Sequence, residues 1–445
     1  MAPRRSGALT RRGALLLPLG LAGCSLFDNL FGSNKVPLPG RREDVMASRA
    51  ELTVPAGAKP RIALPPATAN AEWPQPGGNP AHVMGHLASG DRLAQAWRSD
   101  IGEGSGYRRK ITSQPVIAGG RVYTMDSDGV VTAFDVRNGA RAWEFETKGR
   151  HDRSTNVGGG IAVDGGVLYA STGRAELLAM DAATGKLKWR QPLGAPARSS
   201  PTVADGRVYL TTAEEQLIGF AVADGKRLWS FQGPTVQTTV LGQPSPAYAD
   251  GLVVAGLGSG DLVTVRAASG AVAWTDSIAA SSGRSSLADL AAITAMPVIA
   301  GERVFAIGLG GLLVSTDLRS GRRLWEREVA GGQTPWVAGD WLFLVTTDQQ
   351  IAALDARDGR VAWRSDLPRY ENPKKQRRPI DWFGPVLVGD RLVVAGTNRA
   401  SLAVSPYTGE ILGQQKLESP ASVAPVVAGG TVYLVTDDGS LLAFR

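Results

Sequence analysis

The stretch DAATGKLKW, Asp181–Trp189, decides the fold because the chain repeats it. Related nine-residue stretches are DVRNGARAW ending at Trp143, AVADGKRLW at Trp229, DLRSGRRLW at Trp325 and DARDGRVAW at Trp363. The glycine marks a tight turn, the aspartate before it can accept hydrogen bonds from turn amides, and the tryptophan falls on the strand that follows. So many copies favour a structural clip in a repeated scaffold over one half of a cofactor site.

A second signal occurs eight times and predicts the architecture. Each copy has a short apolar strand, a glycine turn and an alternating strand, and the copies begin at Pro115, Ile161, Pro201, Pro246, Pro297, Pro335, Pro385 and Pro425. A third strand and the tryptophan-bearing strand follow, so four short antiparallel strands recur every ~40–50 residues, which is typical of propeller blades. The predicted fold class is all-β, an eight-bladed β-propeller of four-stranded antiparallel blades.

The last copy ends at Phe444 and Arg445 without a fourth strand, whereas AQAWRSDIG, Ala94–Gly102, has a fourth-strand pattern without three strands before it. We therefore expect the ring to close by pairing the N-terminal strand with the C-terminal blade, which removes two sheet edges. The repeat departs from its pattern at a few positions. Ala221, Arg266 and Ser405 replace the aspartate, and Gly413 replaces the tryptophan.

The N-terminus has the pattern of an exported lipoprotein. A basic start, an apolar run from Ala14 to Leu21 and the sequence LAGC ending at Cys24 predict a signal peptide over residues 1–23 and lipid attachment at Cys24, the only cysteine. The apolar run is shorter than the ~20 residues that a membrane span needs. Export through the Sec or the twin-arginine route fits this pattern. Residues 24–72 are then the lipidated cysteine and an extended tether, and residues 73–445 are the propeller.

The formal charge of +7 depends on the signal peptide, whose removal takes away four arginines and no acidic residue and leaves about +3. A nucleic-acid-binding surface needs a concentrated basic face, and the mature chain has no such excess. We therefore expect no nucleic-acid partner.

The pattern AxDGxVY, LxALDxxTG and W resembles the quinoprotein (PQQ) propeller repeat, and eight such blades behind a lipobox resemble the BamB lipoprotein family of the outer-membrane β-barrel assembly machinery. WPQPGGNPAH, Trp73–His82, is similar to the opening of that family. The resemblance implies a non-enzymatic scaffold that is held by its lipid, palmitate included, on the periplasmic face of the outer membrane. It implies assistance in delivering and inserting barrel proteins. Ser25 after the cysteine, rather than aspartate, favours outer-membrane sorting by resemblance to bacterial lipoproteins.

The resemblance also implies partners: the periplasmic domains of the barrel protein BamA, other subunits of the machinery and unfolded outer-membrane proteins. The family binds BamA through the connectors after its third and fourth blades, here Thr238–Pro246 and Ser282–Leu290. The family's arginine beside the leucine is missing here, and Arg284 could replace its charge. The candidate partner-binding residues are Val240, Leu241, Gly242, Gln243, Arg284, Leu287, Asp289 and Leu290.

Two alternatives stay open at the level of sequence. One is a PQQ-dependent periplasmic dehydrogenase, but such enzymes typically carry a vicinal disulfide, a bound calcium and a catalytic aspartate, and one cysteine cannot form that disulfide. The other is a periplasmic propeller that binds a glycan or another ligand in its central funnel. We expect no enzymatic activity, no cofactor, no metal and no catalytic residue.

Other motifs favour structural roles. His82 and His86 have metal-like spacing but lie in a Gly/Pro-rich stretch without helical periodicity, and we expect surface or tether histidines. HDRS at His151 offers no defensible nucleophile–base pair. Three further motifs fall where hairpin turns are expected: DSDG at Asp126, GLGSGD at Gly256 and DDG at Asp437.

One face of the ring should carry the binding function. The turns after the first and third strands are uniformly short, whereas the connectors between blades vary and are longest at Thr275–Met296 and Arg364–Gly384. The latter holds four cations, Lys374, Lys375, Arg377 and Arg378, near Tyr370, Trp382 and Phe383. This run is either a solvated charge cluster or a dock for an acidic protein surface or lipid headgroups.

Overall fold

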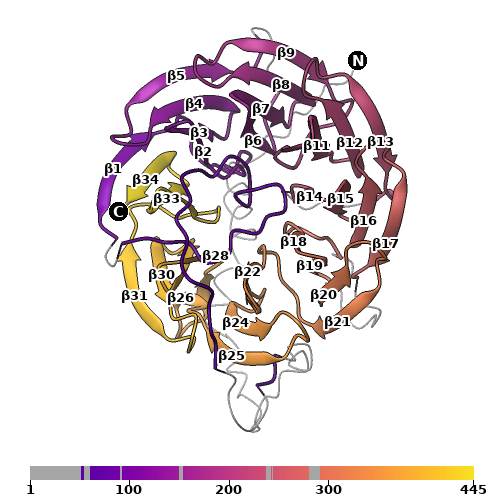
Figure 1. The fold of residues 1–445 in the computed structure, drawn as a ribbon. Helices are drawn as coiled ribbons and strands as arrows, with labels where there is room; N and C mark the ends of the chain where they lie inside the picture. Colours follow the sequence, from indigo (N-terminus) through magenta and orange to yellow (C-terminus); the bar gives the residue numbers. More distant parts are fainter. Residues whose placement is uncertain are drawn as a thin grey trace, which may run out of the picture. The chain divides into compact units, whose positions relative to one another are not determined.

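The structure, a computed structural model, describes residues 52–54, 61–90, 93–149, 154–236, 242, 244–279 and 291–445. Within these residues all regular elements are β-strands, and no helix there is long and apolar enough to cross a membrane. The unit from Ser48 to Arg445 holds eight four-stranded antiparallel sheets arranged in a ring. Their first strands surround the centre and their fourth strands form the outside (Figure 1). The predicted eight-bladed propeller is confirmed.

Blades 1 to 4 follow each other along the chain. Blade 1 is β2 (Val116–Ala118), β3 (Arg121–Met125), β4 (Val130–Asp135) and β5 (Arg141–Glu146), and blade 2 is β6 (Gly159–Asp164), β7 (Val167–Thr172), β8 (Glu176–Asp181) and β9 (Leu187–Pro192). Blade 3 is β10 (Thr202–Ala204), β11 (Arg207–Thr211), β12 (Gln216–Ala221) and β13 (Arg227–Gln232), and blade 4 is β14 (Ala247–Ala249), β15 (Leu252–Gly256), β16 (Asp261–Arg266) and β17 (Val272–Ser277).

The second half repeats this order, with an additional hairpin before blade 7. Blade 5 is β18 (Val298–Ala300), β19 (Arg303–Ile307), β20 (Leu312–Asp317) and β21 (Arg323–Glu328), and blade 6 is β22 (Trp336–Ala338), β23 (Trp341–Val345), β24 (Gln350–Asp355) and β25 (Val361–Asp366). The hairpin is β26 (Tyr370–Asn372) and β27 (Arg377–Pro379). Blade 7 is β28 (Trp382–Val388), β29 (Arg391–Gly396), β30 (Ala400–Val404) and β31 (Ile411–Lys416), and blade 8 is β32 (Val426–Ala428), β33 (Thr431–Thr436), β34 (Ser440–Phe444) and β1 (Gln95–Asp100).

The repeated nonapeptide forms a contact between neighbouring blades. The side chain of Asp181 accepts hydrogen bonds from the backbone N–H and the hydroxyl of Thr184, and these bonds lower the pKa of Asp181. Gly185 follows with φ +73°, and a Cβ there would lie 2.7 Å from the ring of Trp143 of the preceding blade. The indole N–H of Trp143 in turn donates to the carbonyl of Ala182 at 3.0 Å. The clip predicted from the sequence is thus an inter-blade contact.

The same bond occurs at seven of the eight seams. The donors are Trp97, Trp143, Trp189, Trp229, Trp274, Trp325 and Trp363, and the acceptor carbonyls are those of Val136, Ala182, Val222, Ala267, Leu318, Ala356 and Pro406. Each donor lies on a fourth strand, and each acceptor lies in the turn between the third and fourth strands of the next blade. A buried indole N–H needs such a partner, so this bond fixes the distance between neighbouring blades.

The eighth seam, from blade 7 to blade 8, lacks the clip because of the way the ring closes. β1 pairs antiparallel with β34, as predicted, so blade 8 takes its fourth strand from the N-terminal side and has no turn between its third and fourth strands. A tryptophan on β31 would have no carbonyl to bind, and Gly413 stands at that position. The glycine at position 413 and the missing fourth strand of the last repeat therefore have the same cause, the way in which the ring closes.

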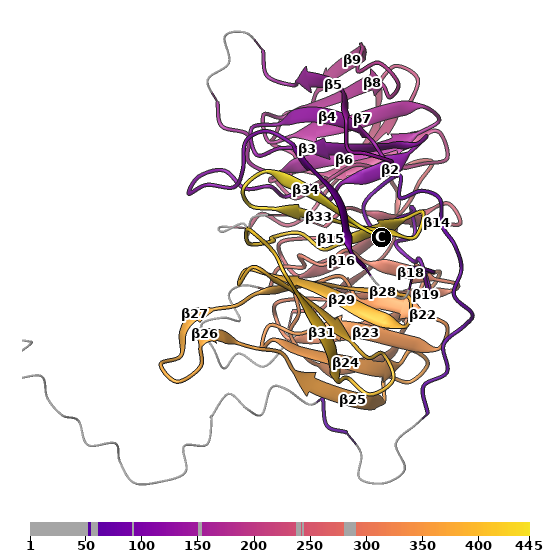
Figure 2. The ribbon, with the colours of Figure 1, turned by 90° about the vertical axis from the view of Figure 1, so that its left-hand side faces the viewer.

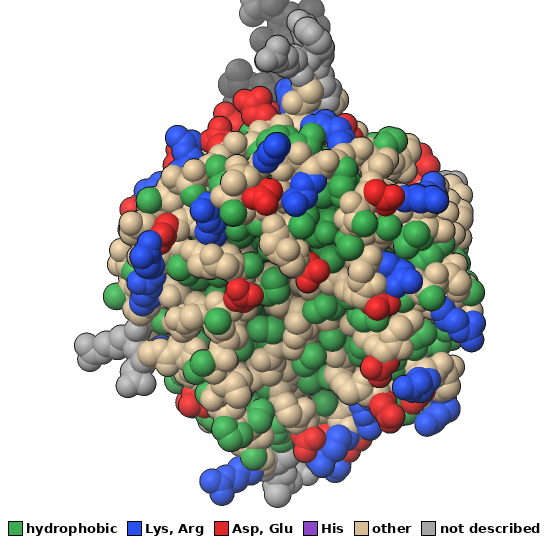
Figure 3. Space-filling view, turned by 45° about the horizontal axis from the view of Figure 1, so that its top comes forward, with side chains coloured by type: hydrophobic (Ala, Val, Ile, Leu, Met, Phe, Trp, Pro, Cys, Tyr) green, Lys and Arg blue, Asp and Glu red, His purple; other side chains and the backbone are tan. Residues whose placement is uncertain are grey.

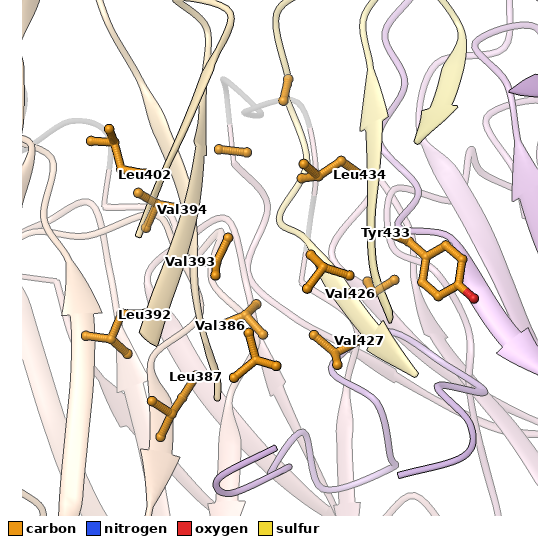
Figure 4. Packing of buried hydrophobic residues seen from close by; sticks show 14 of the residues in the cluster. Val386, Leu387, Leu392, Val393, Val394, Leu402, Val426, Val427, Tyr433 and Leu434 are labelled. Atoms are coloured by element: carbon orange, nitrogen blue, oxygen red, sulfur yellow. The ribbon is translucent and has the colours of Figure 1, made fainter. Parts of the chain in front are cut away.

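Apolar packing holds this eighth seam instead. Figure 4 shows side chains of β28, β29 and β30 facing those of β32 and β33 across the seam, and they belong to the same buried cluster. Leu387 and Val427 are fully buried. Their burial supplies the hydrophobic contribution that a clip would add elsewhere.

The segment from residues 68 to 90 closes one end of the ring. Its backbone and side chains bond the inner strands of successive blades: Asn70 bonds blade 8, Trp73 bonds Ile117 of blade 1, and Pro74 bonds Val163 of blade 2. Further along, Gln75, Pro80, Ala81, Gly85 and Leu87 bond blades 3, 4, 5, 6 and 7 in that order. Figure 1 shows this indigo trace across the centre of the ring. We call residues 68–90 the floor segment.

The expectation of surface or tether histidines is wrong for both His82 and His86. Each is only 5% exposed, because the floor segment packs them against the inner strands. His82 Nδ1 lies 2.7 Å from the carbonyl oxygen of Pro297, and His86 Nδ1 lies 2.9 Å from that of Pro65. The side chains of Leu52 and Ile62 are buried as well, so the packed body begins before Trp73.

Candidate functional site: the connector face and the axial cup

The two faces of the ring differ as expected from the lengths of the turns. The floor segment lies along one side of the ring, on the right in Figure 2, and the β26–β27 hairpin projects from the other side. The turns at Asp126, Gly256 and Asp437 are short hairpin connections, as predicted. We call the side with the β26–β27 hairpin and the links between blades the connector face.

The two connectors expected to bind a partner flank the same blade. Connector 3–4 leads into β14 of blade 4, and connector 4–5 leaves its β17. Their stems meet at Gly256 of that blade, where a Cβ would lie 2.4 Å from Ile293 and 3.3 Å from Pro244. Ile293 N–H also donates to the carbonyl of Leu257 at 3.0 Å. The fold therefore holds the bases of both connectors side by side.

Of the candidate partner-binding residues, the structure describes Gly242, which has φ +84° and lines the central cavity. The other candidates, Val240, Leu241, Gln243, Arg284, Leu287, Asp289 and Leu290, lie outside the described residues, as does the candidate lipidation site Cys24. Their roles stay predictions.

The basic run of the seventh connector is a solvated hairpin. Lys374, Lys375, Arg377 and Arg378 are exposed, and Arg378 pairs with Glu371 at 3.2 Å. Of the nearby aromatic residues, Tyr370 lies on β26 of this hairpin and is partly exposed. Trp382 is buried with its N–H on the carbonyl of Pro368, and Phe383 faces the central cavity. Figure 3 shows basic and acidic side chains interspersed over the face it draws.

A cavity of about 590 Å³ occupies the axis above the floor segment, and we call it the axial cup. Trp73, Gly77 and His82 of the floor line it, together with Trp336 of blade 6. Its wall comes from residues just before or at the start of the first strand of each blade, among them Thr112, Gly159, Arg198, Gly242, Thr294, Gly332, Phe383 and Ser422. The indole rings of Trp73 and Trp336 stack with centroids 6.2 Å apart.

Two cations line the axial cup, Lys110 and Arg198, and no aspartate or glutamate is among its described lining residues. Burial lowers the pKa of the Arg198 guanidinium, with no carboxylate countering the effect. Burial of His82 lowers its pKa to about 4, so its imidazole is neutral at pH 7. Among the lining side chains, Trp73 Nε1, His82 Nε2 and Arg198 Nε are buried without a hydrogen-bond partner.

Quinone chemistry does not fit the described part of the cup. Calcium binding in such enzymes uses carboxylate ligands, and their catalytic aspartate takes a proton from the substrate, yet the described lining has no carboxylate. The described residues also hold no group of three His, Cys, Asp or Glu side chains suited to a metal ion.

Sequence reasoning missed Lys110, Arg198 and the tryptophans of the cup. Aligning the eight blades on the residue that starts each first strand would have found Arg198. It stands three residues before Pro201, where the seven other copies have the uncharged residues Thr112, Gly158, Gln243, Thr294, Gly332, Trp382 and Ser422.

Fold and site together define a PQQ-like eight-bladed propeller with a closed floor and a charged cup. The family model described as outer membrane protein assembly factor BamB matches residues 94–154, 127–365 and 347–445. The chain belongs to this family. Membership supports the expectation that it is an assembly factor associated with the outer membrane rather than an enzyme.

Relatives described as outer membrane protein assembly factor BamB agree with this assignment. The chain is 30% identical over 244 residues to that of Bordetella pertussis, covering 55% of this chain and 60% of the relative. It is 29% identical over 216 residues to that of Nitrosomonas eutropha, covering 48% of this chain and 51% of the relative. The matches thus span little more than half the length of these two relatives. For the Burkholderia pseudomallei relative, the identity is 29% over 358 residues, covering 79% and 88%.

Solved structures support the fold. BamB from Moraxella catarrhalis superposes with a TM-score of 0.68 at 18% identity, covering 79% of this chain and 99% of that one. Quinohemoprotein alcohol dehydrogenase from Comamonas testosteroni superposes with a TM-score of 0.65 at 15% identity, covering 85% of this chain and 81% of that one. At these identities the propeller is shared, and chemistry does not follow from it.

Proposed function

We propose that the chain is a non-catalytic scaffold subunit of the outer-membrane β-barrel assembly machinery. It is anchored through lipidated Cys24 to the periplasmic face of the outer membrane, and it helps to deliver and insert barrel proteins. Family membership supports the assembly role, and the lipobox LAGC supports the anchor. Replacing Cys24 with alanine should move the protein from the membrane fraction to the soluble periplasm. Continued sedimentation with the membrane would contradict the lipid anchor.

The connectors around blade 4 bind the periplasmic domains of a BamA-like protein. The observation that carries this proposal is the meeting of both connector stems at Gly256, which presents two loops from one rigid blade. Leu241 and Leu290 supply apolar anchors and Arg284 supplies the charge. Apolar anchors at the centre of an interface typically contribute 2 kcal/mol or more, about a thirtyfold change in affinity.

A binding assay with purified BamA periplasmic domains tests this surface. Leu241→Ala, Arg284→Ala and Leu290→Ala should each weaken binding, by about tenfold or more for the leucines. Leu228→Ala is the matched control, because Leu228 is an exposed leucine on β13, an outer strand. Equal affinity of all four variants and the wild type would exclude the blade 4 connectors as the binding surface.

Unfolded barrel proteins pair with the free edge of β31. All six residues of this outer strand are exposed, whereas each of the other fourth strands has residues that are buried or partly buried. Ile411 and Leu412 are 47% and 56% exposed, and Gly413 leaves open space beside them. An edge with unpaired backbone groups and apolar side chains is suited to β-augmentation by an extended chain.

A further inference from the structure

A second recess lies on the connector face, where blades 1 and 2 meet the link from blade 8. Its volume is about 430 Å³, within the range of ~300–1,000 Å³ typical of ligand pockets, and none of its described lining residues belongs to the axial cup. The lining comes from the link between β1 and β2, the β3–β4 turn and the link between β5 and β6. The residues are Gly106, Tyr107, Arg108, Arg109, Asp128, Lys148, Ser154 and Thr155. We call this the blade 1 recess.

The fold fixes the loop that carries the first four of these residues. The hydroxyl of Ser127, which is fully buried in the β3–β4 turn, donates to the carbonyl of Gly104 at 2.7 Å. The backbone N–H of Gly106 donates to the carbonyl of Arg109 at 2.6 Å, which closes the tip of the loop. Tyr107 stands at this tip and is 98% exposed. The loop therefore presents an aromatic ring to solvent from a defined position.

One carboxylate in the recess has three cations around it. The side chain of Arg174 is only 2% exposed, and it donates to the backbone carbonyl of Asp128 at 2.8 Å and to its Oδ1 at 3.0 Å. Arg109 Nη1 lies 3.8 Å from Oδ1 and Lys148 Nζ lies 4.0 Å from Oδ2, both beyond hydrogen-bond distance. Because Arg174 already neutralises this carboxylate, the charges of Arg109 and Lys148 are not compensated by it.

The recess therefore has an excess of positive charge. Arg108 adds another cation, and none of the described residues accepts a hydrogen bond from the side chains of Arg108, Arg109 or Lys148. Even when Glu146 of an adjoining recess is counted, four cations stand against two carboxylates. A phosphate monoester carries about −1.5 to −2 charges at pH 7, which balances this excess.

We propose that the blade 1 recess binds a phosphate monoester. The guanidinium groups of Arg108 and Arg109 donate paired hydrogen bonds to the phosphate oxygens, and Lys148 supplies a further charge. The ring of Tyr107 packs against the group that the phosphate esterifies. The phosphate belongs either to a soluble ester or to a lipid headgroup. This site is separate from the blade 4 connectors and does not depend on the assembly role.

Isothermal titration calorimetry on the full-length protein, extracted from membranes in a non-ionic detergent, tests the proposal. The probe is glycerol 3-phosphate at about pH 8, where the ester is a dianion, and glycerol is the matched neutral control. We expect one phosphate ester per chain, no binding of glycerol, and an affinity that falls as salt is added. Equal heats from the ester and from glycerol would overturn the proposal.

Variants locate the binding site. Arg109→Gln and Lys148→Gln should each weaken binding of glycerol 3-phosphate by about fivefold or more, and the double variant should abolish it. Both side chains are partly exposed, so we expect the variants to fold. Lys374→Gln is the control, because Lys374 is an exposed cation in the β26–β27 turn on the same face, outside the recess. Equal weakening by Lys374→Gln, or undiminished affinity in the folded double variant, would contradict the assignment.

A second titration distinguishes the two sources of the phosphate. The probe is dihexanoyl phosphatidate, which joins the same headgroup to two short acyl chains, and dihexanoylglycerol corrects for uptake by the detergent. Tighter binding of the phosphatidate than of glycerol 3-phosphate, by a factor that Tyr107→Ser reduces, supports a lipid headgroup. Equal affinities support a soluble ester. Binding of neither ester at millimolar concentration excludes a phosphate site in the recess.

Discussion

Adding one methyl group beneath a clip tryptophan should destabilise the ring, whereas adding it at the seam without a clip should not. Gly270 has φ +71°, and a Cβ built on it would lie 2.7 Å from Cδ2 of Trp229. Trp229 cannot retreat easily. Its N–H donates to the carbonyl of Ala267 at 2.8 Å, and its ring stacks on Tyr209 with centroids 5.9 Å apart.

The magnitude for Gly270→Ala follows from these contacts. A non-glycine residue in the left-handed region costs ~1 kcal/mol, and overpacking costs ~1–3 kcal/mol. Displacing the indole would add ~1 kcal/mol for its hydrogen bond. We expect a total loss of about 2–5 kcal/mol. Gly413 has open space around its Cβ position, so Gly413→Ala should be neutral or stabilise the protein by about 0.4–1 kcal/mol through the unfolded state.

Urea unfolding followed by circular dichroism measures both variants against the wild type. The Gly270→Ala midpoint should fall clearly, with the Gly413→Ala midpoint equal to or above that of the wild type. If the free energy of unfolding of Gly270→Ala lies within about 0.5 kcal/mol of the wild-type value, or if both variants lose equal stability, the tryptophan contacts do not stabilise the seams between blades.

Three further predictions concern the floor, the closure and the free edge. Burial lowers the pKa of His82 to about 4, so between pH 6.5 and pH 4 only the unfolded state takes up a proton at this residue. The free energy of unfolding should therefore fall by up to ~3 kcal/mol as the pH decreases across that window. His82→Asn, in which asparagine tolerates the positive φ, should flatten this part of the pH–stability curve. Deleting residues 440–445 removes β34 and leaves β1 unpaired, so we expect loss of cooperative unfolding and rapid cleavage in limited proteolysis, whereas Arg445→Ala, which keeps β34, should retain cooperative unfolding. Leu412→Lys on β31 should reduce suppression of aggregation of an unfolded barrel protein in a light-scattering assay, while Leu228→Lys on the clipped strand β13 should not; equal activity of the two would exclude the β31 edge.

The blades could be predicted because the repeat uses local signals. Asp181, Thr184, Gly185 and Trp189 each act within one turn or on the adjacent blade, so the same residues recur wherever the same contact recurs. The ring closure was also visible, since one blade lacked a strand that stood alone at the other end of the chain. Together these two observations explain Gly413, because the blade that follows it has no turn between its third and fourth strands to accept a tryptophan N–H.

The floor segment could not be predicted because its partners are remote. His82 contacts Pro297, 215 residues away, and Gln75 bonds Val203, 128 residues away. Such contacts leave no periodicity in Trp73–His82, and two histidines in a Gly/Pro-rich stretch therefore looked like surface residues. The charge of the axial cup was hidden for the same reason, since Arg198 becomes a lining residue only when eight connectors converge on one axis.

The measurement that tests the assembly role most directly is affinity purification of the tagged, membrane-extracted protein, followed by identification of what stays bound after a mild salt wash. We expect a BamA-like barrel protein among the retained proteins, with less of it recovered by the Leu290→Ala variant than by Leu228→Ala. Absence of any barrel-assembly protein, together with a quinone absorbance or oxidoreductase activity in the purified sample, would contradict the scaffold function.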